Sequence, residues 1–200
     1  MSTTTRKPSS IRRREIAEAT LQVIGERGAT SLTAARLAEE VGMTSGALFR
    51  HFASVDEILS ATADLAIEAL EETFPAPELP SVERLRTLAL RRIELIGGKP
   101  GLSWLLLSDQ VYLCVPKDAV GRLRKLVQRS RIYLLRALRE GIAAGDLRSD
   151  LDPEQMLPIF TGTVHSLILA RSARHRARRA STRASAEQVI DALLALLAAT

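Results

Sequence analysis

The chain has 200 residues, of which 46% are hydrophobic and 26% charged, with a net charge of +5 and an isoelectric point near 10. These values are ordinary for a soluble globular protein with an apolar core and one large or two small domains. The single cysteine, Cys114, excludes an intrachain disulfide and a cysteine-rich zinc site. No apolar run reaches the ~18 residues of a membrane-spanning helix, and the basic N-terminus lacks the apolar stretch of a secretory signal, so we expect a cytoplasmic protein.

The pattern of apolar residues is helical nearly throughout, since aromatic residues make up only 4% of the chain and no long alternation of period two occurs. Residues 1–9 are rich in Ser and Thr and are expected to form a flexible arm. A first helix is predicted from about Ser10 to Arg27, with Gly28 as its stop. Its buried face is expected to carry Ile16, Thr20, Val23 and Ile24.

Two short helices joined by a glycine turn are predicted next. Thr33 can cap the first of them, which ends at Gly42, and Thr44 can cap the second. A Ser54–Glu57 capping box then opens a long fourth helix to about Phe74. Inward-facing residues of the two short helices are expected to form a small core that holds them at a defined angle; they are Leu37, Val41, Leu48 and Phe52.

The rest of the chain is predicted to be a helical body that begins after three prolines, Pro75, Pro77 and Pro80. Gly145 is expected to end one of its helices, and Asp152-Pro153 to begin another. The predicted body helices cover about residues 82–96, 101–113, 116–144, 153–173 and 185–199. The arginine-rich run 171–179 is interpreted as a solvated loop and helix end, with a second nucleic-acid patch as the alternative.

The segment of about residues 10–60 resembles the DNA-binding domain of the TetR/AcrR family of transcriptional regulators. The resemblance is carried by Ile16–Gly28, Leu37-Ala38, Val41-Gly42, Leu48–Phe52 and Asp56–Leu59. It implies an all-α fold in which an N-terminal three-helix helix-turn-helix head is joined by a long helix to a helical ligand-binding and dimerisation body. The expected divisions are a flexible arm at 1–9, the DNA-binding domain at 10–56, and the body at 57–200.

In helix-turn-helix docking, the start of the second short helix meets base edges in the major groove of DNA. Gly46 lacks bulk and lets this helix seat deeply, while Arg36, Arg50 and His51 can donate to phosphates or bases. The alternative for Arg36 is a position on a solvated face, and the alternative for His51 is a cap at the helix end. Phe49 is expected to pack against other residues rather than to stack on bases. The predicted DNA-binding residues are Thr33, Arg36, Thr44, Ser45, Gly46, Phe49, Arg50 and His51.

The head departs from the family pattern at several positions. The family often has Lys or Arg where Ser45 stands, Thr or Ser at Ala47, Tyr at Phe49 and Lys at Val55. Because phosphate contacts are lost with these changes, we expect basic residues near the N-terminus to supply part of the missing charge. These residues are Arg6, Lys7, Arg12, Arg13 and Arg14.

Body residues that could line a ligand cavity are Trp104, Tyr112, Cys114, Phe160 and His165, and a plain core or interface position is the alternative for each. The sequence contains no Walker loop, GxGxxG, HExxH or GxSxG motif, so no enzyme is expected. Its three histidines, at positions 51, 165 and 175, do not form a ligand-spaced set. We therefore expect no cofactor and no metal.

The resemblance predicts a homodimer, formed through the last two helices, that binds a near-palindromic double-stranded DNA operator. It implies a repressor that is released by a small effector, which the few charges on the presumed pocket-lining faces predict to be largely apolar. A transcriptional activator and an effector-independent DNA-binding protein are the alternatives. An enzyme on a helical scaffold is a further one, but no residue set in the chain suggests a reaction.

Overall fold

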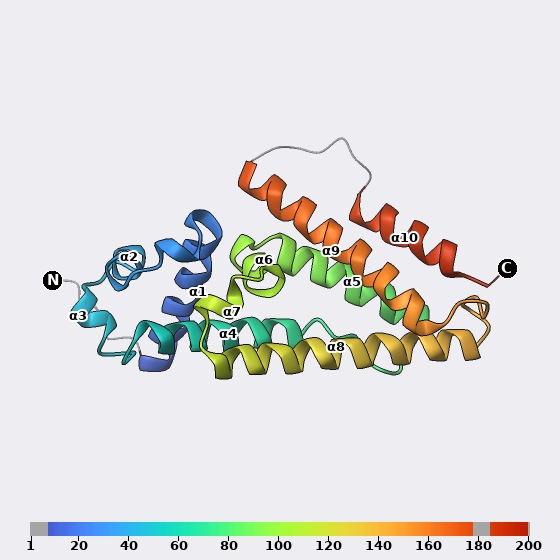
Figure 1. The fold of residues 1–200 in the computed structure, drawn as a ribbon, viewed down its shortest axis with the longest axis horizontal. Helices are drawn as coiled ribbons and strands as arrows, with labels where there is room; N and C mark the ends of the chain where they lie inside the picture. Colours follow the sequence, from blue (N-terminus) through green and yellow to red (C-terminus); the bar gives the residue numbers. More distant parts are fainter. Residues whose placement is uncertain (1–7, 178–184, 200) are drawn as a thin grey trace. The chain divides into compact units, whose positions relative to one another are not determined.

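The computed structural model describes residues 8–177 and 185–199, and over these ranges the chain is all-α (Figure 1). In these ranges it forms ten α-helices and one 3₁₀ helix, and the only β-type pairing is an isolated antiparallel bridge between Leu147 and Ala198. The elements are α1 Ser9–Arg27, η1 Ala29–Ser31, α2 Ala34–Glu40, α3 Ser45–Leu48, α4 Val55–Glu71, α5 Ser81–Gly97, α6 Pro100–Leu107, α7 Val111–Cys114, α8 Lys117–Ala143, α9 Pro153–Ala177 and α10 Ala186–Leu197. None of the described helices combines the length and the apolarity needed to cross a membrane.

The chain divides into two compact units. The first contains the chain up to Glu68 together with Pro100–Leu123, and the second contains Ala69–Lys99 together with the chain from Arg124 onward. The helix-turn-helix elements α2 and α3 therefore belong to the first unit.

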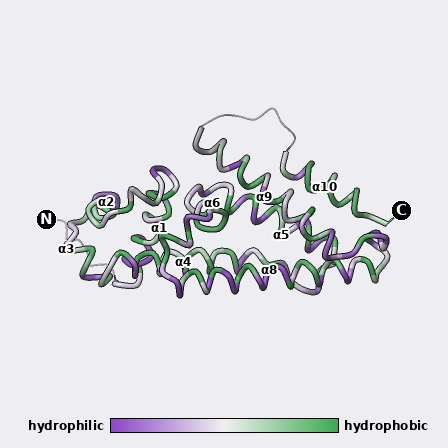
Figure 2. Tube along the Cα trace, in the orientation of Figure 1, coloured by the Kyte–Doolittle hydropathy of each residue, from purple (hydrophilic) through white to green (hydrophobic). Residues whose placement is uncertain are grey.

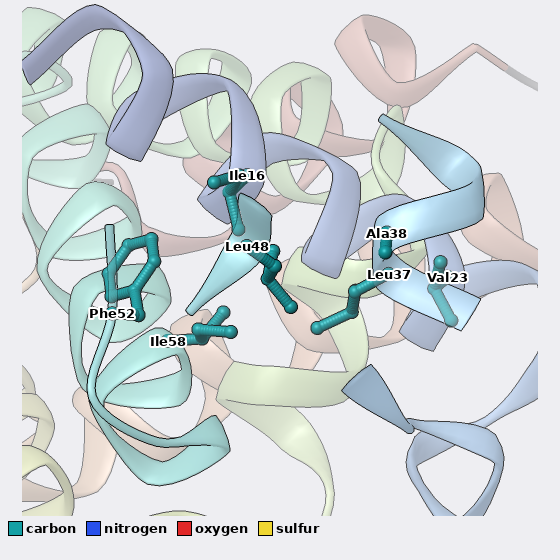
Figure 3. Close-up of a cluster of buried hydrophobic side chains, with 7 residues drawn as sticks. All are labelled: Ile16, Val23, Leu37, Ala38, Leu48, Phe52 and Ile58. Carbon is teal, nitrogen blue, oxygen red and sulfur yellow. The ribbon is translucent and has the colours of Figure 1, made fainter. Parts of the chain in front are cut away.

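The core of the first unit is built by apolar side chains from α1 to α4. Figure 3 shows Ile16, Leu37, Leu48 and Ile58 converging from four different helices. All four are fully buried, so α3, which has only four residues, is held by tertiary packing rather than by its own length. Val23, Ala38 and Phe52 complete this cluster.

A close backbone contact joins α1 to α6 in the same unit. A Cβ atom built on Gly101 would lie 1.9 Å from the carbonyl oxygen of Leu21, and one built on Gly25 would lie 2.6 Å from the amide nitrogen of Gly101. The two helices can approach this closely only because neither residue has a side chain.

The second unit is a bundle in which α5 packs along α9, and α10 packs against both. Its core includes Leu88 from α5, Phe160 from α9 and Ile190 from α10. Figure 2 shows hydrophobic and hydrophilic segments alternating along α8, as expected of a helix with one buried face.

Most predicted helix boundaries are confirmed to within a few residues. Gly28, Gly42 and Gly145 follow helix ends and adopt positive φ angles of 80°, 66° and 79°, a conformation that glycine tolerates. The Asp152-Pro153 start of α9 is also confirmed, because the Asp152 carboxylate accepts from the Glu154 amide at 2.7 Å.

Two predicted helices differ from the structure. The helix predicted at 101–113 is two helices, α6 and α7, because the Ser108 hydroxyl accepts from the amide of Gln110 at 3.2 Å and forms a turn that competes with the helical pattern. α9 continues to Ala177 rather than ending at Ala173. The added residues are Ala, Arg and His, none of which breaks a helix, so the arginine run begins as the end of α9, which is the helix-end part of the prediction, while residues 178 and 179 lie outside the described residues.

Candidate DNA-binding surface

Side-chain caps set the start of both short helices. The Thr33 hydroxyl accepts from the amide of Arg36 at 3.2 Å, and the Thr44 hydroxyl accepts from the amide of Ala47 at 3.1 Å. Between the two helices, Gly42 supplies the positive φ that redirects the chain. The predicted caps and turn are therefore confirmed, and they present the first turn of α3 in a defined orientation.

The helix-turn-helix has one buried and one accessible side. Leu37, Leu48 and Phe52 are buried in the head core, as predicted, and Val41 is half-buried against it. None of the residues predicted to bind DNA is buried. Thr33, Thr44, Gly46, Phe49 and Arg50 are exposed, whereas Arg36, Ser45 and His51 are half-buried.

The packing role expected for Phe49 is wrong. Its side chain is 45% exposed, whereas its neighbour Leu48 is fully buried. Phe49 follows the last residue of α3, and the chain there directs Leu48 and not Phe49 into the core. The ring of Phe49 is therefore accessible to solvent, as several of the polar candidates are.

The two arginines of the helix-turn-helix differ in the internal hydrogen bonds that their side chains make. Arg36 donates from Nη1 to the carbonyl of Ser31 at a long 3.3 Å. Arg50 is exposed, and within residues 8–177 and 185–199 no hydrogen bond or ion pair holds its side chain. Arg50 is thus a cation that an external anion can pair with at little internal cost.

His51 is tethered to the start of α1. Its Nδ1 lies 3.1 Å from the hydroxyl of Ser9, and its carbonyl accepts from Nη1 of Arg13. These contacts join the segment after α3 to α1, so a role in positioning that segment adds to the predicted phosphate contact.

Arg13 is a half-buried residue that braces α1 against the start of α4, a role that was not predicted from the sequence. Its Nη2 donates to Glu57 at 2.8 Å, and its guanidinium lies 4.0 Å from the centre of the Phe52 ring. The amide of Ala53, which donates to Glu57 at 2.6 Å, and then Arg13 lower the pKa of Glu57. No local pattern predicts this brace, because Arg13 and Glu57 are 44 positions apart.

The other basic residues that were predicted to supply charge near the N-terminus either form ion pairs or lie outside the described residues. Arg12 pairs with Glu15 at 2.8 Å and Arg14 with Glu68 at 2.7 Å, and both arginines lie within α1. Arg6 and Lys7 lie outside the described residues. Any contribution of Arg12–Arg14 to DNA binding must therefore compete with carboxylate partners inside the head.

The Ser54–Glu57 capping box is confirmed on one side only. The Ser54 hydroxyl accepts from the amide of Glu57 at 3.1 Å, as the motif requires. The Glu57 carboxylate, however, bonds to the amide of Ala53 instead of that of Ser54. The carboxylate thus accepts from an amide one residue earlier than the motif predicts, and in that position it also accepts from Arg13.

The five ligand-pocket candidates do not form one cluster within either unit. Trp104, Tyr112 and Cys114 belong to the first unit, where the Trp104 indole donates to Gln110 at 3.5 Å and Tyr112 is exposed. Phe160 is plain core of the second unit, since it is fully buried on α9, and His165 lies on an exposed part of the same helix. Partial desolvation of the imidazole, with the charge of Arg92, lowers the pKa of His165.

An open depression of about 520 Å³ does occur in the second unit, but none of the five candidates lines it. Its lining residues are Ala69, Glu72, Thr73, Leu90, Arg91, Glu94 and Leu95. Across the described part of the chain, no group of three or more His, Cys, Asp or Glu side chains is arranged to hold a metal ion.

The sequence matches one family of known proteins over the whole helix-turn-helix. The family model described as "Bacterial regulatory proteins, tetR family" matches residues 16–62. The nucleoid occlusion factor SlmA of Sodalis glossinidius (strain morsitans) is 30% identical over 138 residues, which cover 64% of this chain and 67% of the relative. The SlmA protein of Vibrio campbellii is 29% identical over 133 residues, with the same two shares.

Solved structures share the fold over nearly the full length. The ketosteroid transcriptional regulator KstR2 of Mycobacterium tuberculosis has a TM-score of 0.75 and 21% identity, and covers 94% of this chain and 96% of its own. AibR, solved in complex with isovaleryl coenzyme A and operator DNA, has a TM-score of 0.73 and 20% identity, and covers 93% of this chain and 97% of its own. The similarity therefore extends past the head to the helical bundle.

Proposed function

Because the chain belongs to the TetR family of bacterial regulatory proteins, which are non-enzymatic DNA-binding regulators of transcription, we propose that it is a ligand-responsive repressor. It binds a near-palindromic operator as a homodimer, and a small effector releases it. In this proposal the N-terminal region binds DNA, with the operator read by α2 and α3, and the C-terminal region binds the effector.

The observation that carries this proposal is the accessible side of the helix-turn-helix. Thr44 and Gly46 stand at the start of α3, and Arg50 follows its end without an internal partner among the described residues. A short helix whose first turn is small and polar can approach base edges, and a free arginine can pair with a phosphate or a guanine.

An exposed apolar stripe on the last two helices supports a dimer. On α9, Ile159, Gly162, Ser166 and Leu169 are exposed at helical spacing, and on α10 Leu196 is 72% exposed. Large apolar side chains that follow one helix face seldom remain in water. A second copy of the chain that covers these faces would supply the second head that a near-palindromic operator requires, since its half-sites are read in successive major grooves about 34 to 36 Å apart.

Release by an effector requires only a difference in affinity between two states. A ligand that binds the DNA-incompetent arrangement more tightly lowers the population that holds the operator. The related fold of AibR has been solved with both isovaleryl coenzyme A and operator DNA, so this fold is compatible with both kinds of partner.

A DNA-binding protein without an effector is the second candidate. Its support is the set of relatives at 28% to 30% identity, whose name refers to nucleoid occlusion. An activator would bind its site through the same helix-turn-helix and would differ in its effect on transcription.

The test is a genome-wide selection of DNA fragments by the purified full-length protein, followed by footprinting of the best site. We expect a near-palindromic sequence with protection on successive major grooves, and reduced transcription in vitro from the promoter that contains it. Binding of arbitrary DNA with no preferred site would contradict the repressor and favour the second candidate. Increased transcription would identify an activator.

A further inference from the structure

The second unit contains an arginine that has no acidic partner. Arg92 on α5 donates from Nε to the hydroxyl of Thr73 at 3.3 Å and from Nη2 to the hydroxyl of Ser130 at 2.9 Å. Both acceptors are neutral, and no carboxylate in the described part of the chain pairs with it. Three other arginines of this unit are each paired: Arg84 with Glu140, Arg129 with Glu71 and Arg171 with Glu94.

The surroundings of Arg92 are aromatic and include a second arginine, Arg129, which is paired with Glu71. The Phe74 ring centre lies 4.9 Å from its guanidinium, and the edge of the Tyr133 ring packs against Phe74 with centres 5.1 Å apart. Arg129 lies 5.9 Å from the same Phe74 ring. Desolvation lowers the pKa of Arg92 to about 10, so the group still carries its charge at neutral pH.

Arg92 is half-buried, and a charge partly withdrawn from water without a counter-ion is costly, so proteins normally pair such groups. Two hydroxyls satisfy donors of Arg92 but do not neutralise it. The planar guanidinium is the side chain best suited to bind a carboxylate through two parallel hydrogen bonds. A carboxylate that replaces the Thr73 hydroxyl as acceptor would exchange a neutral partner for a charged one.

The open depression of about 520 Å³ lies next to this group. Thr73 both lines it and accepts from Arg92, so the route from the depression to the guanidinium passes the Thr73 side chain. Ala69, Leu90 and Leu95 give the depression an aliphatic wall, while its charged lining residues are Glu72, Arg91 and Glu94, of which Glu94 is paired with Arg171. This arrangement suits a molecule with one anionic end and an aliphatic body.

We propose that Arg92 binds the carboxylate of an aliphatic monocarboxylate effector, whose tail lies against Ala69, Leu90 and Leu95. This inference rests on the proposed function, because it takes the second unit to be the effector-binding body. It sharpens the expectation of a largely apolar effector by adding one negative charge at a defined position.

The experiment measures binding to the full-length protein without DNA, by calorimetry and thermal unfolding. The probes are straight-chain carboxylates from hexanoate to dodecanoate, each compared with the alcohol of the same length. We expect at least one carboxylate to bind and its matched alcohol not to bind. Arg92→Gln should weaken that binding roughly a hundredfold, the scale for removing one partner of a buried charge pair.

Arg139→Gln is the control, because Arg139 is an exposed arginine of α8 in the same unit and is not among the residues that line the depression. We expect this variant to retain affinity within about twofold. Equal affinity of Arg92→Gln and Arg139→Gln for the carboxylate would place the carboxylate elsewhere and overturn the proposal. If Arg92→Gln does not fold, Arg92→Lys keeps the charge without the planar fork and should weaken binding about tenfold.

The pKa of His165 supplies a second readout that does not depend on stability. The charge of Arg92 contributes to lowering this pKa, so a bound carboxylate should raise it in a nuclear magnetic resonance titration. If no carboxylate binds the wild-type protein while an operator is recovered, this inference fails and the proposed function stands. If Arg92-dependent binding occurs but no operator exists, the proposed function fails instead.

Discussion

Arg13 and Arg50 both lie in the small N-terminal head, but their side chains differ in whether internal contacts hold them. Arg13 is held by Glu57, by the carbonyl of His51 and by the Phe52 ring, whereas Arg50 has no such partners among the described residues. Binding DNA through Arg13 would mean breaking the brace, but binding through Arg50 breaks nothing. The operator contact is therefore expected at Arg50.

Replacing Arg50 by alanine should weaken operator binding and reduce the slope of log affinity against log salt by about one, because one phosphate contact is lost. The measurement is fluorescence anisotropy with operator DNA over a salt series. Arg27→Ala is the control, since Arg27 is an exposed arginine at the end of α1 and outside the helix-turn-helix. An unchanged slope in Arg50→Ala would contradict the assignment.

The Glu57 brace should make the stability of the head depend on pH. Because the folded state lowers the pKa of Glu57 below its ordinary 4.5, the stabilisation is present above that pH and is lost as pH falls through the folded pKa. In Glu57→Gln, the fall in the free energy of unfolding below about pH 4.5 should be smaller than in the wild type. Urea denaturation at a series of pH values from 6 down to about 3 gives the free energy of unfolding of both proteins. Identical pH profiles for the two proteins would exclude the brace.

At the scale of elements, the contact between α1 and α6 depends on two residues without side chains. A methyl group on Gly101 would meet the backbone of Leu21, which cannot move aside as a flexible side chain can. The packing of α6 on the DNA-binding head is thus set by backbone geometry and tolerates little adjustment.

Gly101→Ala should therefore destabilise the protein by about 3 kcal/mol or more, the upper range for overpacking in a core. Urea denaturation gives the difference in the free energy of unfolding. Gly121→Ala is the matched control, because a Cβ on Gly121 within α8 meets nothing within 4 Å. That change should be neutral or stabilise by up to about 1 kcal/mol. Equal effects of the two substitutions would refute the steric argument.

At the scale of the whole molecule, the exposed apolar side chains are unevenly distributed. Ile159 and Leu169 on α9 and Leu196 on α10 are exposed on helices that pack together in the second unit. Leu113, at 87% exposure, stands apart from them on α7 of the first unit. A dimer through the last two helices would bury the former group, whereas Leu113 lies on neither of these helices.

Combining Leu169→Glu with Leu196→Glu should convert the dimer to a monomer, since two carboxylates per chain would be desolvated in the interface. Sedimentation velocity measures the change in mass. Operator affinity should fall by two orders of magnitude or more, because avidity between half-sites is lost. Leu113→Glu should leave both properties unchanged. A double variant that remains dimeric would exclude these faces as the interface.

Local patterns were enough to predict most of the helices and the helix-turn-helix. Caps at Thr33 and Thr44, the positive φ of Gly42 and the spacing of Leu37 and Leu48 act over a few residues, so their effect can be predicted without tertiary contacts. The split of 101–113 into two helices was missed because a single hydroxyl, that of Ser108, decided it against an otherwise helical pattern.

The sequence by itself determined the all-helical class, the family and the position of the helix-turn-helix, because these follow from short-range periodicity and from a motif carried by contiguous residues. Only the tertiary structure decided which arginines are free. Arg13 meets Glu57 over 44 positions, and Arg92 meets Ser130 over 38 without finding a carboxylate. Whether a charged side chain is paired depends on which residues the fold places next to it, and the spacing of residues along the chain does not indicate this.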